Sequence, residues 1–454
     1  MLLDSIFQPF VDARPVAVMA RAAMERVLDS ERIDQVFHDN ATGQYEYVIP
    51  FSGLVKLLGQ VVLRKQPSVN AAYQAMDEKL EASVTAVYRK LARTELPISE
   101  ALVTHSFEEA SATVRALRAT EPAWITGYTT RVLDGNHPSA TEHRIEELRH
   151  TWDAPLPGKA LVVYRPDVRL IEQVHLTDDG HAQERRMLND VIATIEPRDL
   201  WVADRNFCTI GFLTSIHHRR GFFIIRQHGT LKGTLIGKRR RIGSDDSGDV
   251  YEQQIRISDD PDMPPVRRIT VILNEPTRDG ETELHILSNV PVTDATASKL
   301  AVLYRKRWTI ETVFADIART LTGEIPSLGY PQAALLALCL SFVVYNAVSM
   351  LESAMGREHG RSTIFGKVSP YYLCLEIEQA TDGMLVAIAE EHWRIFATMP
   401  PREFAATLRN IASHMRLARY KKHSRGPKKP RPPRGKYTNG GHASTAKLIG
   451  NKSR

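Results

Sequence analysis

The sequence predicts a mixed α/β protein that has an all-helical segment before its core and a basic tail after it. Apolar residues recur at helical spacing through the first 120 residues, and short strand-like apolar runs then alternate with helical segments. A chain of 454 residues is also too long for one compact core. We therefore expect five parts: a helical N-terminal domain (1–120), the first part of a mixed-sheet core (121–226), a β-rich insertion (227–291), the second part of the core with C-terminal helices (292–415), and a disordered basic tail (416–454).

The N-terminal part is expected to consist of amphipathic helices joined by polar turns, and the sequence alone indicates only a helical domain. Lys56, Arg64 and Lys65 are candidates for a DNA contact, although charges on an exposed helix are usually only solvated. The expected helices are Val16–Leu28, Ile49–Leu63, Ala71–Leu91 and Ser99–Leu117.

Strand signals begin near Trp124. The predicted core consists, in chain order, of three successive strands, a helix, a fourth strand, a second short helix and a fifth strand. In order, the named elements are strands Gly127–Leu133, Lys159–Tyr164 and Val168–Leu176, helix His181–Ile195, and strands Leu200–Ala203 and Phe222–Ile225. The first strand is expected to run into a turn at Asp134-Gly135-Asn136.

The insertion is predicted from short runs in which apolar and polar residues alternate between turns. These runs are Val250–Ile257, Ile269–Leu273 and Leu284–Leu287. A basic run precedes them, and it consists of Lys238, Arg239, Arg240 and Arg241. Such a run is usually a solvated loop, but beside an active site it would guide DNA.

The segment from Lys299 to Leu321 is predicted to be one amphipathic helix. We take Leu303 as the reference direction around the helix axis. Four apolar residues lie within roughly 40° of that direction and form a buried face with it: Ile310, Phe314, Ile317 and Leu321. Tyr304, Arg307 and Glu311 follow the edge of that stripe, half in the core and half outside it. A phenol, a cation and an acid in one row suit a site for a metal and a phosphate. The alternative is an ordinary surface helix with a solvated Arg and Glu.

The spacing Tyr304-x2-Arg307-x3-Glu311 resembles the signature of the DDE transposases of bacterial insertion sequences. The resemblance implies a ribonuclease-H-like fold with a β insertion between the second Asp and the Glu. It also implies that the helical N-terminal region (1–120) helps to recognise the DNA ends of the transposon. It implies that Glu311 is the third metal-binding carboxylate and that Tyr304 and Arg307 hold DNA phosphate. The family has a Lys seven residues after the Glu, where this chain has Ala318, so we assign no Lys role.

Asp134 and Asp204 are the candidates for the first two carboxylates, because each comes at the end of a predicted strand. WVADRNF resembles the family's second-Asp strand, and Arg205 is then a candidate for phosphate contact, with a surface salt bridge as the alternative. Asp134 lies in LDG, which also marks an ordinary turn, and Asp204 has the alternative of a helix N-cap. Asp178 and Asp179 are rivals of Asp134, but TDDGH looks more like a loop.

Three carboxylates brought together would repel one another unless cations bind between them. Hard oxygen ligands favour Mg²⁺ or Mn²⁺, and two such ions would activate the attacking oxygen and stabilise the leaving oxygen at a phosphodiester. This chemistry would serve both steps that the resemblance implies, which are metal-dependent cutting at transposon ends and joining of the freed 3′-hydroxyl to target DNA. The open alternatives are a metal-dependent nuclease without joining, and an inactive DNA-binding derivative.

The charge distribution fits a partner that is a polyanion. The net charge is +6, yet residues 416–454 hold thirteen Lys or Arg and no Asp or Glu, so the rest of the chain is net acidic. The expected partner is double-stranded DNA, bound by a homodimer. The three cysteines are widely spaced, and the N-terminus does not look like a signal peptide. The most apolar run, Ala333–Val348, is too short to span a membrane. We therefore expect a cytoplasmic protein that does not bind a membrane.

Trp308 is a candidate for base stacking, but interior packing is the favoured expectation.

Overall fold

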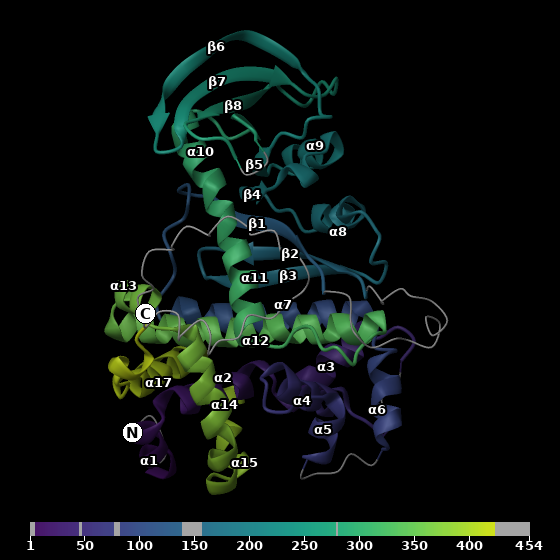
Figure 1. Ribbon diagram of the computed structural model, residues 1–454, viewed down its shortest axis with the longest axis vertical. Coiled ribbons are helices and arrows are strands. Elements are labelled where there is room, and N and C mark those ends of the chain that lie inside the picture. The colour runs from purple at the N-terminus through teal and green to yellow at the C-terminus, as the bar shows by residue number, and fades with distance from the viewer. Residues whose placement is uncertain (1–4, 45–47, 77–81, 139–156, 278–279, 423–454) are drawn as a thin grey trace, which may run out of the picture.

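One nine-stranded mixed sheet runs through the upper two thirds of the molecule, and helices fill the lower part (Figure 1). The computed structural model describes residues 5–44, 48–76, 82–138, 157–277 and 280–422. The strand order is β3-β2-β1-β4-β5-β9-β8-β7-β6. The predicted mixed α/β class is therefore confirmed.

The N-terminal segment is helical, as predicted. Several of its helices begin at side-chain caps, where Asp29, Ser68 and Ser83 each accept a hydrogen bond from a main-chain N–H three residues later. The helices are α1 (Gln8–Ala13), α2 (Pro15–Val27), α3 (Ser30–Asn40), α4 (Phe51–Val62), α5 (Val69–Gln74), α6 (Val84–Leu91) and α7 (Leu96–Ala116).

Five strands form the half of the sheet that carries the candidate carboxylates. β2 is antiparallel to both β1 and β3, whereas β4 lies parallel to both β1 and β5. The strands are β1 (Thr129–Asn136), β2 (Lys159–Arg165), β3 (Leu170–Thr177), β4 (Asp199–Ala203) and β5 (Phe222–Arg226). The turn expected at residues 134–136 is wrong, because β1 continues through Asn136 and pairs there with β2.

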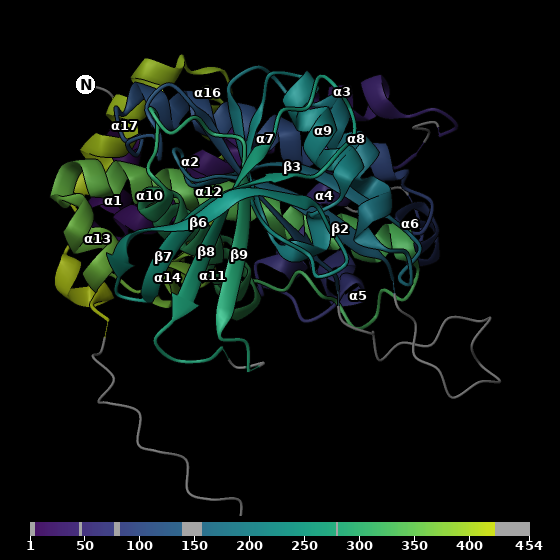
Figure 2. The same cartoon turned by 90° about the horizontal axis from the view of Figure 1, so that it is seen from above.

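The later strands extend this same sheet. β9 (Glu283–Ser288) pairs antiparallel with β5, and β8 (Val266–Leu273), β7 (Gly248–Arg256) and β6 (Thr234–Asp245) follow outward (Figure 2). The basic run Lys238–Arg241 is part of edge strand β6 and not a loop, which corrects the solvated-loop expectation. Both faces of β6 are exposed, so its sequence needs no apolar alternation.

Helices cover both faces of the five-stranded half. α7 and α12 (Pro331–His359) lie side by side against β3, while α8 (Leu188–Ala193) and α9 (Ile210–His218) pack on the other face (Figure 1). Asn346 of α12 is buried and exchanges hydrogen bonds with the main chain of Ile171 in β3. Among the described residues, α12 alone is long and apolar enough to cross a membrane, yet 89% of its most apolar window is buried inside the protein, as in a core helix.

The single helix expected over Lys299–Leu321 is wrong in one respect. The chain forms α10 (Ala297–Arg305), a 3₁₀ turn η5 (Lys306–Trp308) and α11 (Thr309–Thr320). Arg64 closes the far end of α11, since its guanidinium donates to the carbonyls of Arg319 and Leu321, each at 3.0 Å. Arg64 therefore supports α11 instead of standing free for DNA.

The remaining helices complete the lower part of the molecule. They are α13 (Arg361–Lys367), α14 (Pro370–Ala387), α15 (Glu390–Trp393), α16 (Ile395–Thr398) and α17 (Pro401–Ser413). The first residues of the expected disordered tail are instead ordered. They form η6 (Leu417–Tyr420), and Lys421 pairs with Val368 in an isolated β-bridge. Residues 423–454, where most of the tail falls, lie outside the described residues.

Candidate active site

Asp134 and Asp204 are brought together by the pairing of two parallel strands. β1 and β4 are in register, with Leu133 opposite Ala203. The next residue on each chain is a candidate aspartate, so the two lie side by side where the pairing of β1 with β4 ends. Asp204 directly follows β4, whereas Asp134 lies inside β1, which continues for two more residues beside β2. Polar side chains at the carboxyl-terminal edge of parallel strands are free to converge on a ligand.

The segment α10–η5–α11 adds the other three predicted residues to the same place. Tyr304 donates its hydroxyl to Asp204 Oδ1 at 3.3 Å. Arg307 donates from Nη1 to Asp134 Oδ2 and from Nη2 to Glu311 Oε1, both at 2.9 Å. Tyr304 and Arg307 also share a side-chain hydrogen bond. The five residues predicted from the sequence motif and the strands therefore form one connected polar cluster.

Tyr304 and Arg307 are more deeply buried than the expected half-in, half-out placement. Each is only 5% exposed, while the side chain of Glu311 is 41% exposed. The 3₁₀ turn changes the rotation of the chain at Lys306–Trp308, and the two carboxylates compensate the charge of Arg307 in the interior. The cluster is therefore open to solvent on the Glu311 side.

Burial controls the ionisation of Asp134. It raises the pKa of this carboxyl to about 6 from an ordinary 3.8, while the Arg307 guanidinium opposes the rise and the nearby Glu311 and Asp204 add to it. Burial also raises the pKa of the Tyr304 hydroxyl well above its ordinary value, with a further contribution from Asp204. Tyr304 therefore stays protonated near neutral pH and acts as a hydrogen-bond donor.

The raised pKa of Asp134 has a measurable effect on stability. Ionisation of a carboxyl whose pKa is higher in the folded state costs folding free energy, and this cost develops between pH 3.8 and about 6. Asp134→Asn, which stays neutral, is therefore expected to gain about 2–3 kcal/mol of unfolding free energy relative to wild type between pH 4 and pH 7. Denaturant melts at both pH values, without divalent ions, test this. A difference that does not change with pH contradicts it.

The donor chemistry of this cluster suits a hard divalent cation, but its arrangement already contains a cation. The guanidinium of Arg307 stands between Asp134 and Glu311. In the described part of the chain, no three His, Cys, Asp or Glu side chains lie close enough together to hold a metal ion. The three carboxylates therefore fit a metal by their chemistry, provided that Arg307 withdraws from at least one of them.

The other predicted DNA-binding residues lie outside this cluster. Arg205 forms an ion pair at 3.1 Å with Glu281, which is the surface salt bridge named as its alternative. On β6, Arg239 lies 3.5 Å from Glu283 and Arg241 lies 2.7 Å from Asp249. In the ion pairs and hydrogen bonds of the described residues, none of Lys238, Arg239, Arg240 and Arg241 contacts Asp134, Asp204 or Glu311.

Two further positions on the motif segment face solvent. Trp308 is 62% exposed, so the expectation that it packs in the interior is wrong. Its ring is available for stacking beside Arg307. Ala318, at the position of the family's Lys, is exposed on α11 and its carbonyl accepts a hydrogen bond from Arg64 at 3.3 Å.

Two residues that border the site, Glu184 and Asn206, are not identified by any pattern in the sequence. Asn206 follows Asp204 by two positions, and its Nδ2 donates to Glu184 Oε2 at 2.5 Å. Only the three-dimensional contact identifies Glu184, since it lies in η3 (Glu184–Met187), inside a segment predicted to be an ordinary helix.

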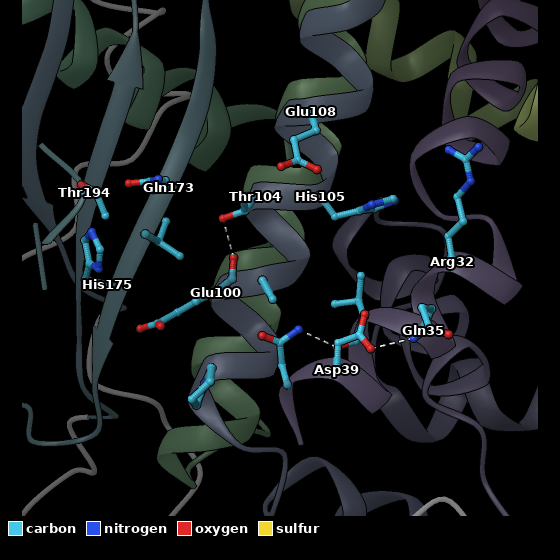
Figure 3. Close-up of a pocket in the computed structure, with 15 residues that line it drawn as sticks. Arg32, Gln35, Asp39, Glu100, Thr104, His105, Glu108, Gln173, His175 and Thr194 are labelled. Carbon is cyan, nitrogen blue, oxygen red and sulfur yellow. Dashed lines mark hydrogen bonds between the residues drawn. The ribbon is translucent and has the colours of Figure 1, made fainter. Parts of the chain in front are cut away.

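A hollow of about 600 Å³ lies elsewhere, between α3, α7 and β3 (Figure 3). Asp39, Glu100, Glu108 and His175 are among its lining residues, and none of the three candidate carboxylates is. Burial raises the pKa of Glu100 to about 7, and its Oε1 accepts a hydrogen bond from the Leu176 N–H at 2.6 Å. Three carboxylates in the lining do not suit the phosphate backbone of DNA.

Comparison with known proteins agrees with the motif. Residues 126–347 match the family model described as the transposase DDE domain, and this range contains Asp134, Asp204 and Glu311. A curated protein of Sinorhizobium fredii (strain NBRC 101917 / NGR234), "Putative transposase y4zB", is 29% identical over 170 residues, which are 36% of this chain and 44% of that protein. The match thus spans less than half the length of this relative.

A solved structure, the synaptic complex of the piggyBac transposase with hairpin DNA, aligns with 80% of this chain and with 75% of the piggyBac chain. The sequence identity is 11% and the TM-score is 0.36. A score of this size is too low to transfer a fold or a function. The family match and the curated relative confirm the predicted resemblance to DDE transposases, which rests on residues 126–347 of this chain and their match to the transposase DDE domain.

Proposed function

We propose that this protein is the transposase of an insertion sequence, which cuts DNA at the ends of the element and joins the freed 3′-hydroxyl to target DNA. The observation that carries the proposal is the convergence of Asp134 and Asp204, which lie side by side where the pairing of β1 with β4 ends, with Glu311 through the guanidinium of Arg307. The family match to residues 126–347 supports the same reaction class.

The core is proposed to be ribonuclease-H-like. In support, the order β3-β2-β1-β4-β5 combines an antiparallel three-stranded meander with two parallel strands, and helices lie on both faces. β6–β9 are the proposed insertion, since they come between Asp204 and Glu311 in the sequence.

Asp134, Asp204 and Glu311 are the residues that would hold divalent ions, with Mg²⁺ or Mn²⁺ as the expected metal and two ions as the expected number. Bound there, such ions would activate the attacking oxygen and stabilise the leaving oxygen. Ionised carboxylates are required, so the raised pKa of Asp134 predicts that protons compete with the metal below about pH 6.

The chain's own residues would orient the phosphodiester. We propose that Arg307 leaves one carboxylate to hold a DNA phosphate, and that Tyr304 keeps its hydrogen bond to Asp204. In the first step the oxygen of water bonds to phosphorus and the bond from phosphorus to the 3′-oxygen breaks. In the second step that 3′-hydroxyl attacks a target phosphodiester, and the target's own 3′-oxygen leaves.

DNA contacts away from the carboxylates are also proposed. Lys238 and Arg240 on exposed strand β6 form no ion pair with another described residue and would meet the phosphate backbone. The N-terminal helices would recognise the element's ends. A homodimer on paired ends is the proposed assembly.

Product analysis separates this proposal from its alternatives. The full chain is incubated with Mn²⁺, a supercoiled target plasmid and a labelled end duplex that carries a free 3′-hydroxyl. Covalent joining of the label to the plasmid supports a transposase. Cutting without joining favours a nuclease. DNA binding without either reaction favours an inactive DNA-binding derivative, an alternative suggested by Ala318 at the position of the family's Lys.

A further inference from the structure

The 3₁₀ turn η3 holds the segment that follows Asp204. Glu184 Oε2 accepts a hydrogen bond from Asn206 Nδ2 at 2.5 Å, and Arg185 Nε donates to the main-chain oxygen of Asn206 at 2.6 Å. Glu184 and Arg185 of η3 thus form hydrogen bonds with the side chain and the main chain of Asn206, respectively. Asn206 is only two positions after the second candidate carboxylate, so its position influences that of Asp204.

The same carboxylate of Glu184 also lies against the residue that follows Asp134. A Cβ added at Gly135 would overlap the Glu184 carboxylate and would come within 2.6 Å of its Cδ, far closer than side chains pack. The φ of Gly135 is not among the positive values of the chain, so the glycine is needed here for space and not for backbone conformation. Glu184 therefore contacts Gly135 in β1 and Asn206 in the 3₁₀ turn Arg205–Phe207 that follows β4.

Glu184 lies on the opposite side of β1 from the side chain of Asp134. Successive residues of a strand point to opposite faces, so Gly135 faces the same way as Leu133. Leu133 packs in the cluster that contains Met187 of η3 and Leu188 of α8. Glu184 is thus placed behind the carboxylates, where it can position them but does not join Asp134 as a ligand on the same face.

We propose that Glu184 is a positioning residue, which fixes the separation of Asp134 and Asp204 through its contacts with Gly135 and Asn206. The inference rests on the proposed function, because it takes the two aspartates to be metal-binding carboxylates. Mg²⁺ demands ligands at about 2.0–2.1 Å in near-ideal octahedral geometry. A strand end that shifts by a few tenths of an ångström therefore weakens the site without removing any ligand.

The test compares Glu184→Ala with Glu184→Gln in the full chain. Gln keeps an oxygen that accepts from Asn206 and occupies the same space beside Gly135, whereas Ala removes both contacts. Mn²⁺ affinity is measured by calorimetry without DNA, and the Mn²⁺ concentration for half-maximal cleavage is measured with an end duplex. We expect both values to worsen about 10- to 100-fold in Glu184→Ala and to stay within about threefold of wild type in Glu184→Gln.

Asn206→Ala provides an independent variant if Glu184→Ala does not fold. It is expected to reproduce the loss of Mn²⁺ affinity, and the Asn206→Ala, Glu184→Gln double variant is expected to be no worse than Asn206→Ala alone, because both changes act through one hydrogen bond. Equal loss in Glu184→Gln and Glu184→Ala overturns the proposal, because it would show that the charge of Glu184 is required. Wild-type affinity in Glu184→Ala also overturns it. Failure of wild type itself to bind Mn²⁺ or cut DNA would instead refute the proposed function.

Discussion

Glu311→Gln is expected to abolish metal-dependent cutting of a transposon-end duplex, by roughly 10³-fold or more, while duplex binding changes little. The substitution keeps the size of the side chain and its capacity to accept from Arg307 Nη2. It removes the negative charge that would hold a divalent ion on α11. Because the side chain is 41% exposed, the fold should tolerate the change.

The measurement pairs single-turnover cleavage with a gel-shift assay on the same labelled duplex. Glu324→Gln is a matched control, since Glu324 has the same chemistry shortly after α11 and is outside the polar cluster. The control variant should cut at the wild-type rate. Equal cutting by wild type and Glu311→Gln would remove Glu311 from the mechanism.

Arg307→Ala is expected to lower the unfolding free energy by about 2–4 kcal/mol at pH 8 in the absence of divalent ions. The Arg307 side chain is 7% exposed and its guanidinium holds two carboxylates, so its removal leaves Asp134 in the interior without a compensating charge. The loss should shrink at pH 5, because Asp134, whose pKa is already raised to about 6, is then protonated. Denaturant melts at the two pH values measure this.

Manganese provides the second arm of this experiment. If the carboxylates bind a cation once Arg307 is gone, saturating Mn²⁺ should stabilise Arg307→Ala more than wild type. Arg307→Lys keeps one positive charge and is the control with an intermediate loss. A loss that is equal at pH 5 and pH 8 and insensitive to Mn²⁺ would show that Arg307 contributes packing only.

The core could be predicted largely from apolar patterning, because its strands and helices bury one or both faces. β1–β5 and β7–β9 were all expected near their observed positions. β6 was missed because an exposed edge strand is stabilised by main-chain pairing with β7, which leaves no apolar signature around Lys238–Arg241. The break at Lys306–Trp308 was missed because the apolar spacing on either side fits a continuous helix.

The candidate site could be predicted as far as local signals reach. Strand ends indicated Asp134 and Asp204, and the spacing on one helical segment indicated Tyr304, Arg307 and Glu311. The burial of Arg307 could not be predicted, because it depends on a carboxylate 173 residues away in the sequence. The contacts of Glu184 with Gly135 and Asn206 are likewise set by packing between separate elements, and no spacing in the sequence records them.

The most direct test of the proposed carboxylate site is the metal preference of Asp204→Cys. A thiolate binds Mg²⁺ poorly and accepts Mn²⁺ better, so a ligand replaced by Cys should respond to the metal supplied. We predict that Asp204→Cys cuts an end duplex at least about 100-fold more slowly than wild type in Mg²⁺ and recovers a substantial part of its rate in Mn²⁺. Wild-type cutting in Mg²⁺, or an equal loss in both metals, would contradict the assignment of Asp204 as a metal ligand.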